Sequence, residues 1–270
     1  MTNITETYAK DLFVGRTVFI TGGGSGIGQG ICHALGALGA NIFIASRKEE
    51  KLRKAAAELT AAGVPTAWAV ADVRDYDQVQ AAVDACAARF GGIDVLINNA
   101  AGNFPCPTAE LSPNGWKTVI DIDLNGTFYC CRAAYPYLKA SEAGGRIISI
   151  TTTLGRSGWP GAAHAGAAKA GIQSLTHALA VEWAPDGILV NSVSPGPIAG
   201  TVGVDKLYVE TGRSAEMTAR VALNRFGETD DIASAVAYLC SPAGKYVTGT
   251  EQVVDGGRQW MFVGHRQDND

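Results

Sequence analysis

A short apolar strand that runs directly into a glycine-rich turn constrains the fold of this chain more than any other feature. Residues 17–21 read Thr-Val-Phe-Ile-Thr, and residues 22–28 read Gly-Gly-Gly-Ser-Gly-Ile-Gly before a helical pattern begins. Glycine lets the backbone approach a ligand closely, and the start of a helix offers free N–H groups and the positive end of the helix dipole. The segment therefore predicts a site for the pyrophosphate of a dinucleotide.

The same alternation of apolar strand and alanine-rich helix continues along the chain. Nearly continuous apolar strands separated by helices are typical of a parallel sheet with helices on both faces. We therefore expect an α/β fold with a doubly wound parallel seven-stranded sheet, in the strand order 3-2-1-4-5-6 with the seventh strand at the edge. The predicted strands are 17–21, 41–45, 66–71, 94–98, 146–151, 189–193 and 252–254, and the predicted helices are 26–38, 49–62, 76–90, 113–140, 163–183 and 229–240.

The length of the chain suits a single domain, residues 1–270, because no internal repeat or low-complexity linker divides it. Doubly wound sheets bind their ligands at the carboxyl ends of the strands. The least regular stretch, residues 195–224, follows the sixth predicted strand, and we expect it to form a substrate lid.

Composition argues against several classes of partner. The net charge is −4 and no basic block is present, so we expect no nucleic-acid partner. No apolar run approaches the ~20 residues of a membrane span, and residues 1–13 lack the apolar core of a signal peptide, so we expect no membrane association. The six cysteines form no CxxC pair, and we predict reduced thiols and no metal site.

Two basic residues at the end of the second predicted strand indicate which dinucleotide binds. An NAD site has an acidic residue near this position, which accepts a hydrogen bond from the ribose 2′-hydroxyl. Here the strand is followed by Ser46, Arg47 and Lys48. A carboxylate repels a 2′-phosphate, whereas a guanidinium holds it by two hydrogen bonds. We therefore predict that the cofactor is NADP(H).

Four motifs together resemble those of the short-chain dehydrogenase/reductase family, whose Rossmann fold binds nicotinamide dinucleotides. They are the glycine-rich turn at 21–28, Asn-Asn-Ala-Ala-Gly at 98–102, Lys169 in a helix and Ser-Pro-Gly-Pro-Ile at 194–198. The resemblance implies that residues 72–73 cap the adenine, that 98–102 line the ribose and that 195–198 hold the nicotinamide carboxamide. The cofactor-binding residues that it implies are Gly22, Gly24, Ser25, Gly26, Ile27, Gly28, Arg47, Lys48, Asp72, Val73, Asn99, Ala100, Ala101, Lys169, Pro195, Gly196, Ile198 and Thr201.

The catalytic positions depart from the usual Asn-Ser-Tyr-Lys set of this family. The family pattern places Asp123 at the Asn position, Thr152 at the Ser position and Ala165 at the Tyr position, whereas Lys169 is retained. In the family the Tyr protonates the carbonyl that is reduced, and the Ser orients that carbonyl. The resemblance therefore implies Asp123, Thr152 and Lys169 as the catalytic residues.

The missing Tyr discriminates between two kinds of reduction. Reducing a ketone forms a basic alkoxide, which needs a positioned acid as it forms, and Ala165 cannot be that acid. Hydride addition to a conjugated enoyl thioester forms a delocalised enolate, which hydrogen-bond donors alone can stabilise. We therefore predict conjugate reduction, with Asp123 relaying the proton through water. His164 is adjacent to Ala165, but neighbouring helix residues point about 100° apart, so we expect a packing residue there.

Five segments sharpen the resemblance, to the 2,4-dienoyl-CoA reductases of the peroxisomal type. They are residues 98–104, 121–128, 152–155, 164–171 and 195–201. The resemblance implies NADPH-dependent reduction of 2,4-dienoyl-CoA to an enoyl-CoA in the degradation of unsaturated fatty acids. Mitochondrial relatives carry a tyrosine at the position of Leu154, so that branch is less similar. The acyl-CoA contacts that it implies are Arg47, Arg74, Phe104, Ser112, Pro113, Asn114 and Lys206.

The resemblance also implies a homo-oligomer, a tetramer formed through the two long helices. Residues 267–270 read Gln-Asp-Asn-Asp and are no peroxisomal targeting tripeptide, so we expect a cytoplasmic enzyme. Two alternatives stay open. One is a reductase of 3-oxoacyl or other carbonyl compounds that uses His164 or water as its acid, and the other is a catalytically silent NADP-binding protein.

Overall fold

A computed structural model describes residues 4–261, with the exception of the side chain of Leu154. The predicted domain, residues 1–270, extends past this range at both ends. Residues 267–270, on which the expected location rests, lie outside the described residues. None of the helices between residues 4 and 261 combines the length and the apolar character that a membrane span requires.

A single parallel sheet forms the centre of the described molecule. The predicted strand order and the edge position of the seventh strand are confirmed. Strands near the middle are buried along their length, as continuous apolar runs predict, whereas the edge strand β3 is only partly buried. Across the sheet the order is β3 (Thr66–Val70), β2 (Asn41–Ser46), β1 (Thr17–Thr21), β4 (Val95–Asn98), β5 (Arg146–Ile150), β6 (Leu189–Pro195) and β7 (Glu251–Val254).

The predicted helices form close to their expected ends, and several short turns join them. The region 113–140 is divided by a π-helical turn, η2. The helices are α1 (Ile4–Thr7), α2 (Gly26–Ala37), α3 (Glu49–Ala61), α4 (Tyr76–Phe90), α5 (Pro113–Ile120), η2 (Asp121–Asn125), α6 (Gly126–Lys139), α7 (Ala163–Trp183), α8 (Val202–Val204), the π-helical η5 (Asp205–Val209), α9 (Ser214–Thr218) and α10 (Thr229–Cys240). The short 3-10 turns are η1 (Thr108–Glu110), η3 (Thr153–Gly155), η4 (Ala184–Asp186), η6 (Pro242–Gly244) and η7 (Arg258–Trp260).

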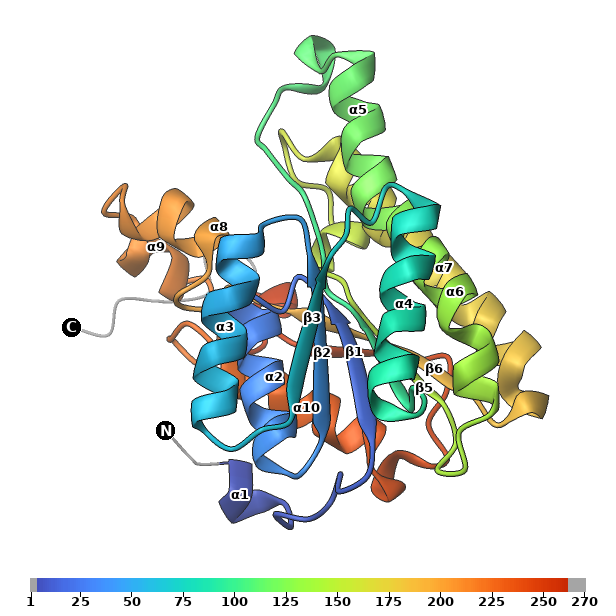
Figure 1. The fold of residues 1–270 in the computed structure, drawn as a ribbon. Coiled ribbons are helices and arrows are strands. Elements are labelled where there is room, and N and C mark those ends of the chain that lie inside the picture. The colour runs from blue at the N-terminus through green and yellow to red at the C-terminus, as the bar shows by residue number, and fades with distance from the viewer. Residues whose placement is uncertain (1–3, 262–270) are drawn as a thin grey trace.

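Helices cover both faces of the sheet, as the doubly wound prediction requires (Figure 1). Side chains of a strand point alternately to the two faces. Ile20 of β1 packs into a core with residues of α2, α3 and α10, whereas its neighbour Phe19 packs into a second core with residues of α4, α6 and α7. In that second core the ring of Phe19 stacks on Phe43 of β2, with 5.7 Å between centroids. The two cores hold the sheet rigidly and leave its carboxyl edge to the loops.

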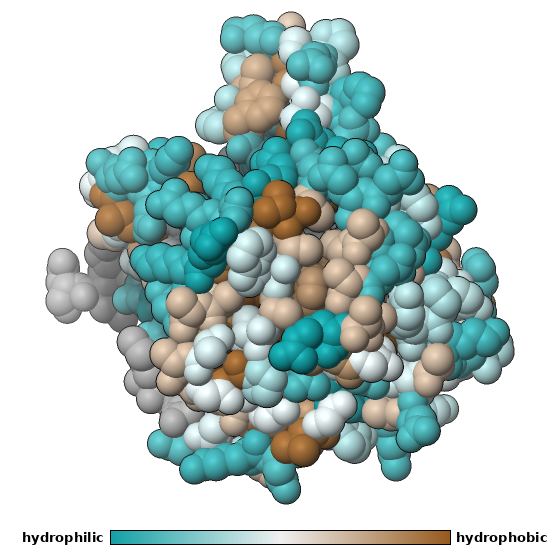
Figure 2. Space-filling view, viewed as in Figure 1, coloured by the Kyte–Doolittle hydropathy of each residue, from teal (hydrophilic) through white to brown (hydrophobic). Residues whose placement is uncertain are grey.

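Two groups of short elements stand at this carboxyl edge. Figure 1 shows α5 projecting beyond it at the top, with α8 and α9 at the upper left. The predicted lid, residues 195–224, contains α8, η5 and α9, and a small apolar cluster of Val204, Tyr208 and Met217 holds these turns together. Figure 2 shows the molecule from the same side as Figure 1, with β3 toward the viewer. Apolar and weakly polar residues occupy the middle of this side, and hydrophilic residues surround them.

Candidate functional site

The turn between β1 and α2 has the backbone that its glycines predict. Gly22 and Gly26 adopt positive φ angles of 70° and 55°, which residues with a side chain rarely adopt. A Cβ atom at Gly28 would stand 2.5 Å from Asn99 Nδ2 and 2.6 Å from the carbonyl oxygen of Gly22. The turn is therefore held tightly against the loop after β4, at the N-terminal end of α2, where helix N–H groups attract an anion.

Asn99 fixes this turn to the sheet. Its Nδ2 donates to the carbonyl oxygens of Thr21 (3.0 Å) and Gly22 (3.1 Å). In return, Thr21 Oγ1 accepts hydrogen bonds from the backbone N–H groups of Asn99 and Ala100. The predicted cofactor residue Asn99 thus also has a structural role, because it sets the distance between the two loops.

A cleft of ≈ 300 Å³ opens beside this turn. Its wall combines predicted cofactor residues from the turn, the end of β2, the loops after β3 and β4, and the segment after β6. Those residues are Gly22, Ser25, Gly26, Ile27, Arg47, Val73, Asn99, Ala100, Ala101 and Thr201. The cradle without room for a Cβ and the basic residue in the wall fit a nicotinamide dinucleotide. Five further lining residues were missed, because small or apolar residue types carry no signal of ligand contact: Ala45, Ser46, Ala71, Ile122 and Val202.

Three of the predicted turn and strand-end residues, Gly24, Gly28 and Lys48, lie beside this cleft rather than in its wall. Gly24 faces α3, where an added Cβ would lie at an ordinary 3.4 Å from the Cβ of Lys51. Lys48 is exposed at the N-cap of α3. The structure therefore brings Arg47, rather than Lys48, to the cleft.

Three charged residues around the cleft are placed differently from one another. Arg47 is exposed and forms no ion pair within residues 4–261. Arg74, by contrast, is paired with Asp72, its Nη2 lying 2.5 Å from Asp72 Oδ2 and its Nε 3.0 Å from both carboxylate oxygens. The Arg74 hydrogen bonds hold the pKa of Asp72 below its usual value. Arg47 is therefore available to an anion without losing a partner, whereas Arg74 must first leave Asp72.

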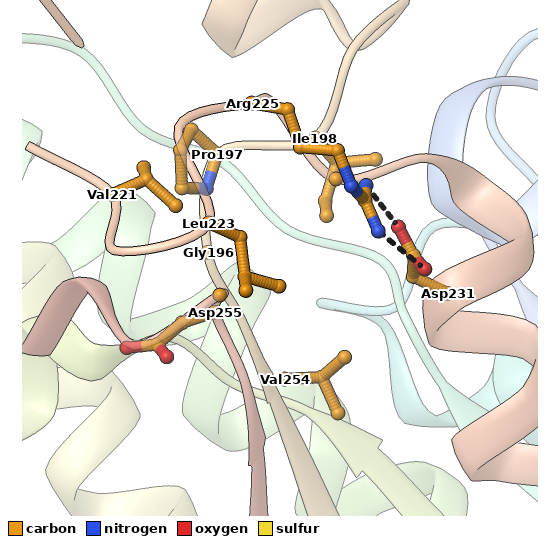
Figure 3. A pocket seen from close by; sticks show the side chains of 11 residues that line it. Gly196, Pro197, Ile198, Val221, Leu223, Arg225, Asp231, Val254 and Asp255 are labelled. Carbon is orange, nitrogen blue, oxygen red and sulfur yellow. Dashed lines mark hydrogen bonds and ion pairs between the residues drawn. The ribbon is translucent and has the colours of Figure 1, made fainter. Parts of the chain in front are cut away.

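The loop after β6 lies over a second, smaller cavity of ≈ 80 Å³, which Figure 3 shows from close by. Arg225 Nη1 and Nη2 donate to the carboxylate of Asp231 over 2.8 and 3.2 Å at its rim. A Cβ at Gly196 would stand 2.7 Å from the Cα of Asp255, so the loop lies directly against the end of β7. The predicted cofactor residues of this loop are Pro195, which ends β6, and Gly196 and Ile198, which line this cavity and not the larger cleft.

The predicted catalytic residues Asp123 and Lys169 meet in the interior. Lys169 Nζ lies 3.2 Å from Asp123 Oδ2, and the two residues are 7% and 1% exposed. The Lys169 ammonium also donates to the carbonyl oxygen of Ile150 at 3.1 Å. The other carboxylate oxygen, Asp123 Oδ1, accepts from the backbone N–H of Gly102 at 2.7 Å. The pair therefore joins the loop after β4, the end of β5 and helix α7.

Asp123 lies within η2, the π-helical turn between α5 and α6. The sequence predicted an uninterrupted helix here. Single π-helical turns inside α-helices are frequent at functional sites. The carbonyl oxygen of Asp123 accepts a hydrogen bond from Thr127 Oγ1 at 2.6 Å. The wide turn thus sets the direction in which the Asp123 side chain leaves the helix.

The remaining predicted catalytic positions are Thr152 and the Tyr position, Ala165. Thr152 is the second residue after β5, has an extended backbone (φ −166°) and is partly buried. Ala165, at the Tyr position, is buried one helical turn before Lys169. His164 is fully buried, and its ring meets the ring of Phe104 edge-on with 4.7 Å between centroids. This contact is the one expected of a packing residue, although neither ring nitrogen finds a hydrogen-bond partner within residues 4–261.

The predicted acyl-CoA residues stand on separate elements of the carboxyl edge. Phe104 is 39% exposed in the loop that leads to α5. Ser112 is the N-cap of α5, where its Oγ accepts from the Gly115 N–H at 3.0 Å, and Pro113 and Asn114 form the first turn. Lys206 is exposed on η5. Of the predicted acyl-CoA residues, only Arg47 lines the cleft of ≈ 300 Å³.

Several 2,4-dienoyl-CoA reductases are similar in sequence to this chain over almost its whole length. A peroxisomal 2,4-dienoyl-CoA reductase of Danio rerio, named as (3E)-enoyl-CoA-producing, is 44% identical over 263 residues, which cover 97% of this chain and 87% of that protein. A Bacillus subtilis protein, named "Probable 2,4-dienoyl-CoA reductase [(2E)-enoyl-CoA-producing]", is 38% identical over 247 residues, which cover 91% of this chain and 97% of that protein.

The fold and a family pattern agree with these relatives. The crystal structure of a short-chain dehydrogenase from Bacillus anthracis superposes with a TM-score of 0.85 at 39% identity, covering 93% of this chain and 98% of that one. The family described as enoyl-(acyl carrier protein) reductase matches residues 22–259, from the glycine-rich turn to η7. The chain therefore belongs to this family of short-chain dehydrogenases/reductases, and it is an oxidoreductase with a Rossmann fold.

Proposed function

We propose that this enzyme reduces 2,4-dienoyl-CoA to an enoyl-CoA with NADPH, in the degradation of unsaturated fatty acids. The observation that carries the proposal is the buried contact between Asp123 and Lys169, one helical turn from the Ala165 that replaces the family's Tyr. The names of the relatives from Danio rerio and Bacillus subtilis support the same substrate class.

The residues of the site suit a reaction whose intermediate is a delocalised anion. A nicotinamide held in the cleft would supply the hydride for C5 of the dienoyl thioester. The negative charge then spreads from C4 over C2 to the thioester oxygen, where the Thr152 hydroxyl and the Lys169 ammonium are the candidate donors. Asp123 would keep a water in place for protonation of carbon, and Lys169 would hold Asp123 in its position.

The carbon that is protonated decides which product forms. Protonation at C2 leaves the double bond between C3 and C4 and gives a (3E)-enoyl-CoA, whereas protonation at C4 gives the (2E) isomer. We favour the (3E) product, because the relatives with 44% identity are named as (3E)-enoyl-CoA-producing. Reaction in D₂O should therefore place one deuterium on C2, which proton NMR of the product detects.

The choice of NADP rests on Arg47. Its guanidinium lines the cleft and has no carboxylate partner within the described residues, so an incoming 2′-phosphate need not break an existing pair. Guanidinium and phosphate form two parallel charge-assisted hydrogen bonds. We infer that Asp72 and Val73 stand next to this end of the cofactor, and that residues 195–201 stand at its nicotinamide end.

The acyl-CoA would lie along the carboxyl edge between the α5 arm and the lid. Phe104 offers a partly exposed ring, and Arg74 and Lys206 offer charges to the CoA phosphates on a protein whose net charge is −4. Residues 112–114 would contact the CoA at the first turn of α5. We retain residues 195–224 as the substrate lid.

A homotetramer formed through α6 and α7 is part of the proposal. Phe128 on α6 is 42% exposed and Val181 on α7 is 80% exposed, so each of these two helices presents an apolar side chain to solvent. A cytoplasmic location stays a prediction, since relatives named as peroxisomal and a bacterial relative are both similar to the chain.

The test follows NADPH absorbance with hexadienoyl-CoA and, in parallel, with a 3-oxoacyl-CoA. We expect oxidation with the dienoyl substrate and little with the 3-oxoacyl substrate. Oxidation with the 3-oxoacyl-CoA alone would establish the carbonyl-reductase alternative. Tight NADPH binding without oxidation by either substrate would favour the silent cofactor-binding protein.

A further inference from the structure

One carboxylate outside the proposed catalytic set is almost completely withdrawn from water. Glu251, the first residue of β7, has a side chain that is 2% exposed. Its Oε1 accepts hydrogen bonds from Thr151 Oγ1, at 2.8 Å, and from Gln173 Nε2. Its Oε2 lies 2.5 Å from Nη2 of Arg156, the one cation within ion-pair distance of it in residues 4–261. Three segments therefore converge on one buried charge.

Each of these segments carries or adjoins a proposed catalytic residue. Thr151 directly precedes Thr152, and its hydroxyl oxygen also lies 3.2 Å from the carbonyl oxygen of Val193. Gln173 stands one helical turn after Lys169 on α7. Arg156 follows η3, the turn that begins after Thr152. The carboxylate of an edge strand thus links both catalytic segments.

The loop that carries Arg156 lies directly on the backbone of α7. A Cβ at Gly155 would stand 3.0 Å from the backbone nitrogen of Ala170 and 3.2 Å from the carbonyl carbon of Lys169. This side of the loop therefore packs directly against the helix backbone. Directly after Gly155, the ion pair of Arg156 with Glu251 ties the same loop to β7.

We propose that Glu251 and Arg156 are positioning residues, which hold Thr152 at a fixed place relative to Lys169 for hydride addition. A buried carboxylate that loses its cation keeps an uncompensated charge, so the surrounding segments must move to reach water. We expect the loop 152–158 to be the segment that moves. It carries Arg156, whose side chain is 50% exposed, whereas the side chain of Glu251 is 2% exposed. The inference rests on the proposed roles of Thr152 and Lys169.

The test compares three substitutions by steady-state kinetics with hexadienoyl-CoA. Arg156→Gln removes the cation at a half-exposed site, and Glu251→Gln removes the charge and keeps the shape. We expect kcat to fall about ten- to a hundredfold in both, as displaced catalytic groups cause, while KM and NADPH affinity stay near their original values. Arg156→Lys restores the charge and should recover most of kcat. Arg53→Gln, which breaks the exposed Arg53–Glu49 pair on α3, serves as the matched control.

A double-mutant cycle separates positioning from simple stabilisation. If Arg156 acts through Thr152, Arg156→Gln should cost little further kcat in a Thr152→Val background. Full additivity of the two effects would overturn the proposal, and so would an unchanged kcat in Arg156→Gln accompanied only by a lower Tm. Hydrogen exchange of the amides 152–158 needs no substrate, so it remains decisive even if the native enzyme does not reduce hexadienoyl-CoA. Unaltered protection of those amides in both variants would equally overturn the proposal.

Discussion

The ammonium of Lys169 lies 3.2 Å from a carboxylate oxygen of Asp123, in the interior of the protein. The two side chains form an ion pair that is almost closed to solvent. Asp123 also accepts the N–H of Gly102, so its carboxylate is oriented from two sides. In the proposed mechanism this arrangement places the proton relay next to the cation that stabilises the developing anion.

Asp123→Asn should separate proton transfer from shape. The amide oxygen can still accept the Gly102 N–H, but it can no longer exchange a proton. We expect turnover of hexadienoyl-CoA to fall by about 10² to 10⁴, with NADPH affinity within a few-fold of the original. Turnover and melting temperature should be measured together. Near-normal turnover would exclude Asp123 as the proton relay. Lys169→Ala serves as the comparison and should reduce the rate and cofactor binding together.

Arg47→Asp should alter the preference between the two nicotinamide cofactors. A charge-assisted contact contributes about 1.5–3 kcal/mol, which corresponds to a preference for NADPH over NADH of at least about tenfold. The substitution should remove that preference, because a carboxylate repels the 2′-phosphate. Calorimetric titration with both cofactors provides the measurement. Arg53→Asp, on α3 and outside the wall of the cleft, is the control. Equal affinities of the native protein for both cofactors would refute the prediction.

Gly28→Ala should abolish cofactor binding, whereas Gly24→Ala should be tolerated. The methyl group at Gly28 would stand 2.5 Å from Asn99 Nδ2 and would push the turn away from the β4 loop, but at Gly24 it would meet Lys51 at an ordinary 3.4 Å. NADPH fluorescence titration of both variants checks the difference. Equal dissociation constants in the two variants would show that the turn tolerates displacement.

Neutralising Arg74 and Lys206 should raise the KM for the acyl-CoA substrate and leave kcat nearly unchanged. This is the pattern of an interaction that is equally strong in the ground state and the transition state. The dependence of KM on salt should also weaken, since fewer charges attract the CoA phosphates. The effect of Arg74→Gln should be the smaller of the two, because Arg74 must leave Asp72 before it can bind CoA. Unchanged KM values in both variants would return the two residues to the role of surface charges.

The six cysteines should differ sharply in reactivity. Five are buried, whereas Cys106 is only partly buried. Burial raises the pKa of Cys131 and Cys240 to about 12, so these thiols carry almost no reactive thiolate at pH 8. We expect a thiol reagent to titrate one group rapidly in the native protein and all six after denaturation. Cys106→Ser should remove the rapid phase, and a second rapid thiol in that variant would contradict the prediction.

The fold could be predicted well because its signals are local. Apolar runs such as that of β1 and the glycines at φ 70° and 55° specify a strand and a turn without reference to the rest of the chain. The extension of β6 to Pro195 could not be predicted. The extension depends on the pairing of Pro195 with Val254 of β7. A proline in the sequence argues against a strand at that position, because it has no N–H group to donate.

The candidate site was predictable only where a motif places a residue at the carboxyl edge. The meeting of Asp123 and Lys169 follows from such positions, and so does the placing of Arg47 in the cleft wall. The ion pairs Arg74–Asp72 and Arg156–Glu251 depend on side-chain packing, which cannot be predicted from the spacing of residues in the sequence. The π-helical turn at Asp121–Asn125 was also missed, because its residue types would serve equally well in an ordinary helix.

That turn has a consequence for how this chain could evolve. Deleting a single codon within residues 121–125 would let α5 and α6 continue as one regular α-helix, while α6 kept its packing against α4. One residue corresponds to about 100° of helix rotation, so the carboxylate of Asp123 would swing away from Lys169. The deletion should remove the proposed proton relay and leave the sheet and the glycine-rich turn in place. A lineage could therefore pass in one step from an enzyme to a protein that only binds its cofactor.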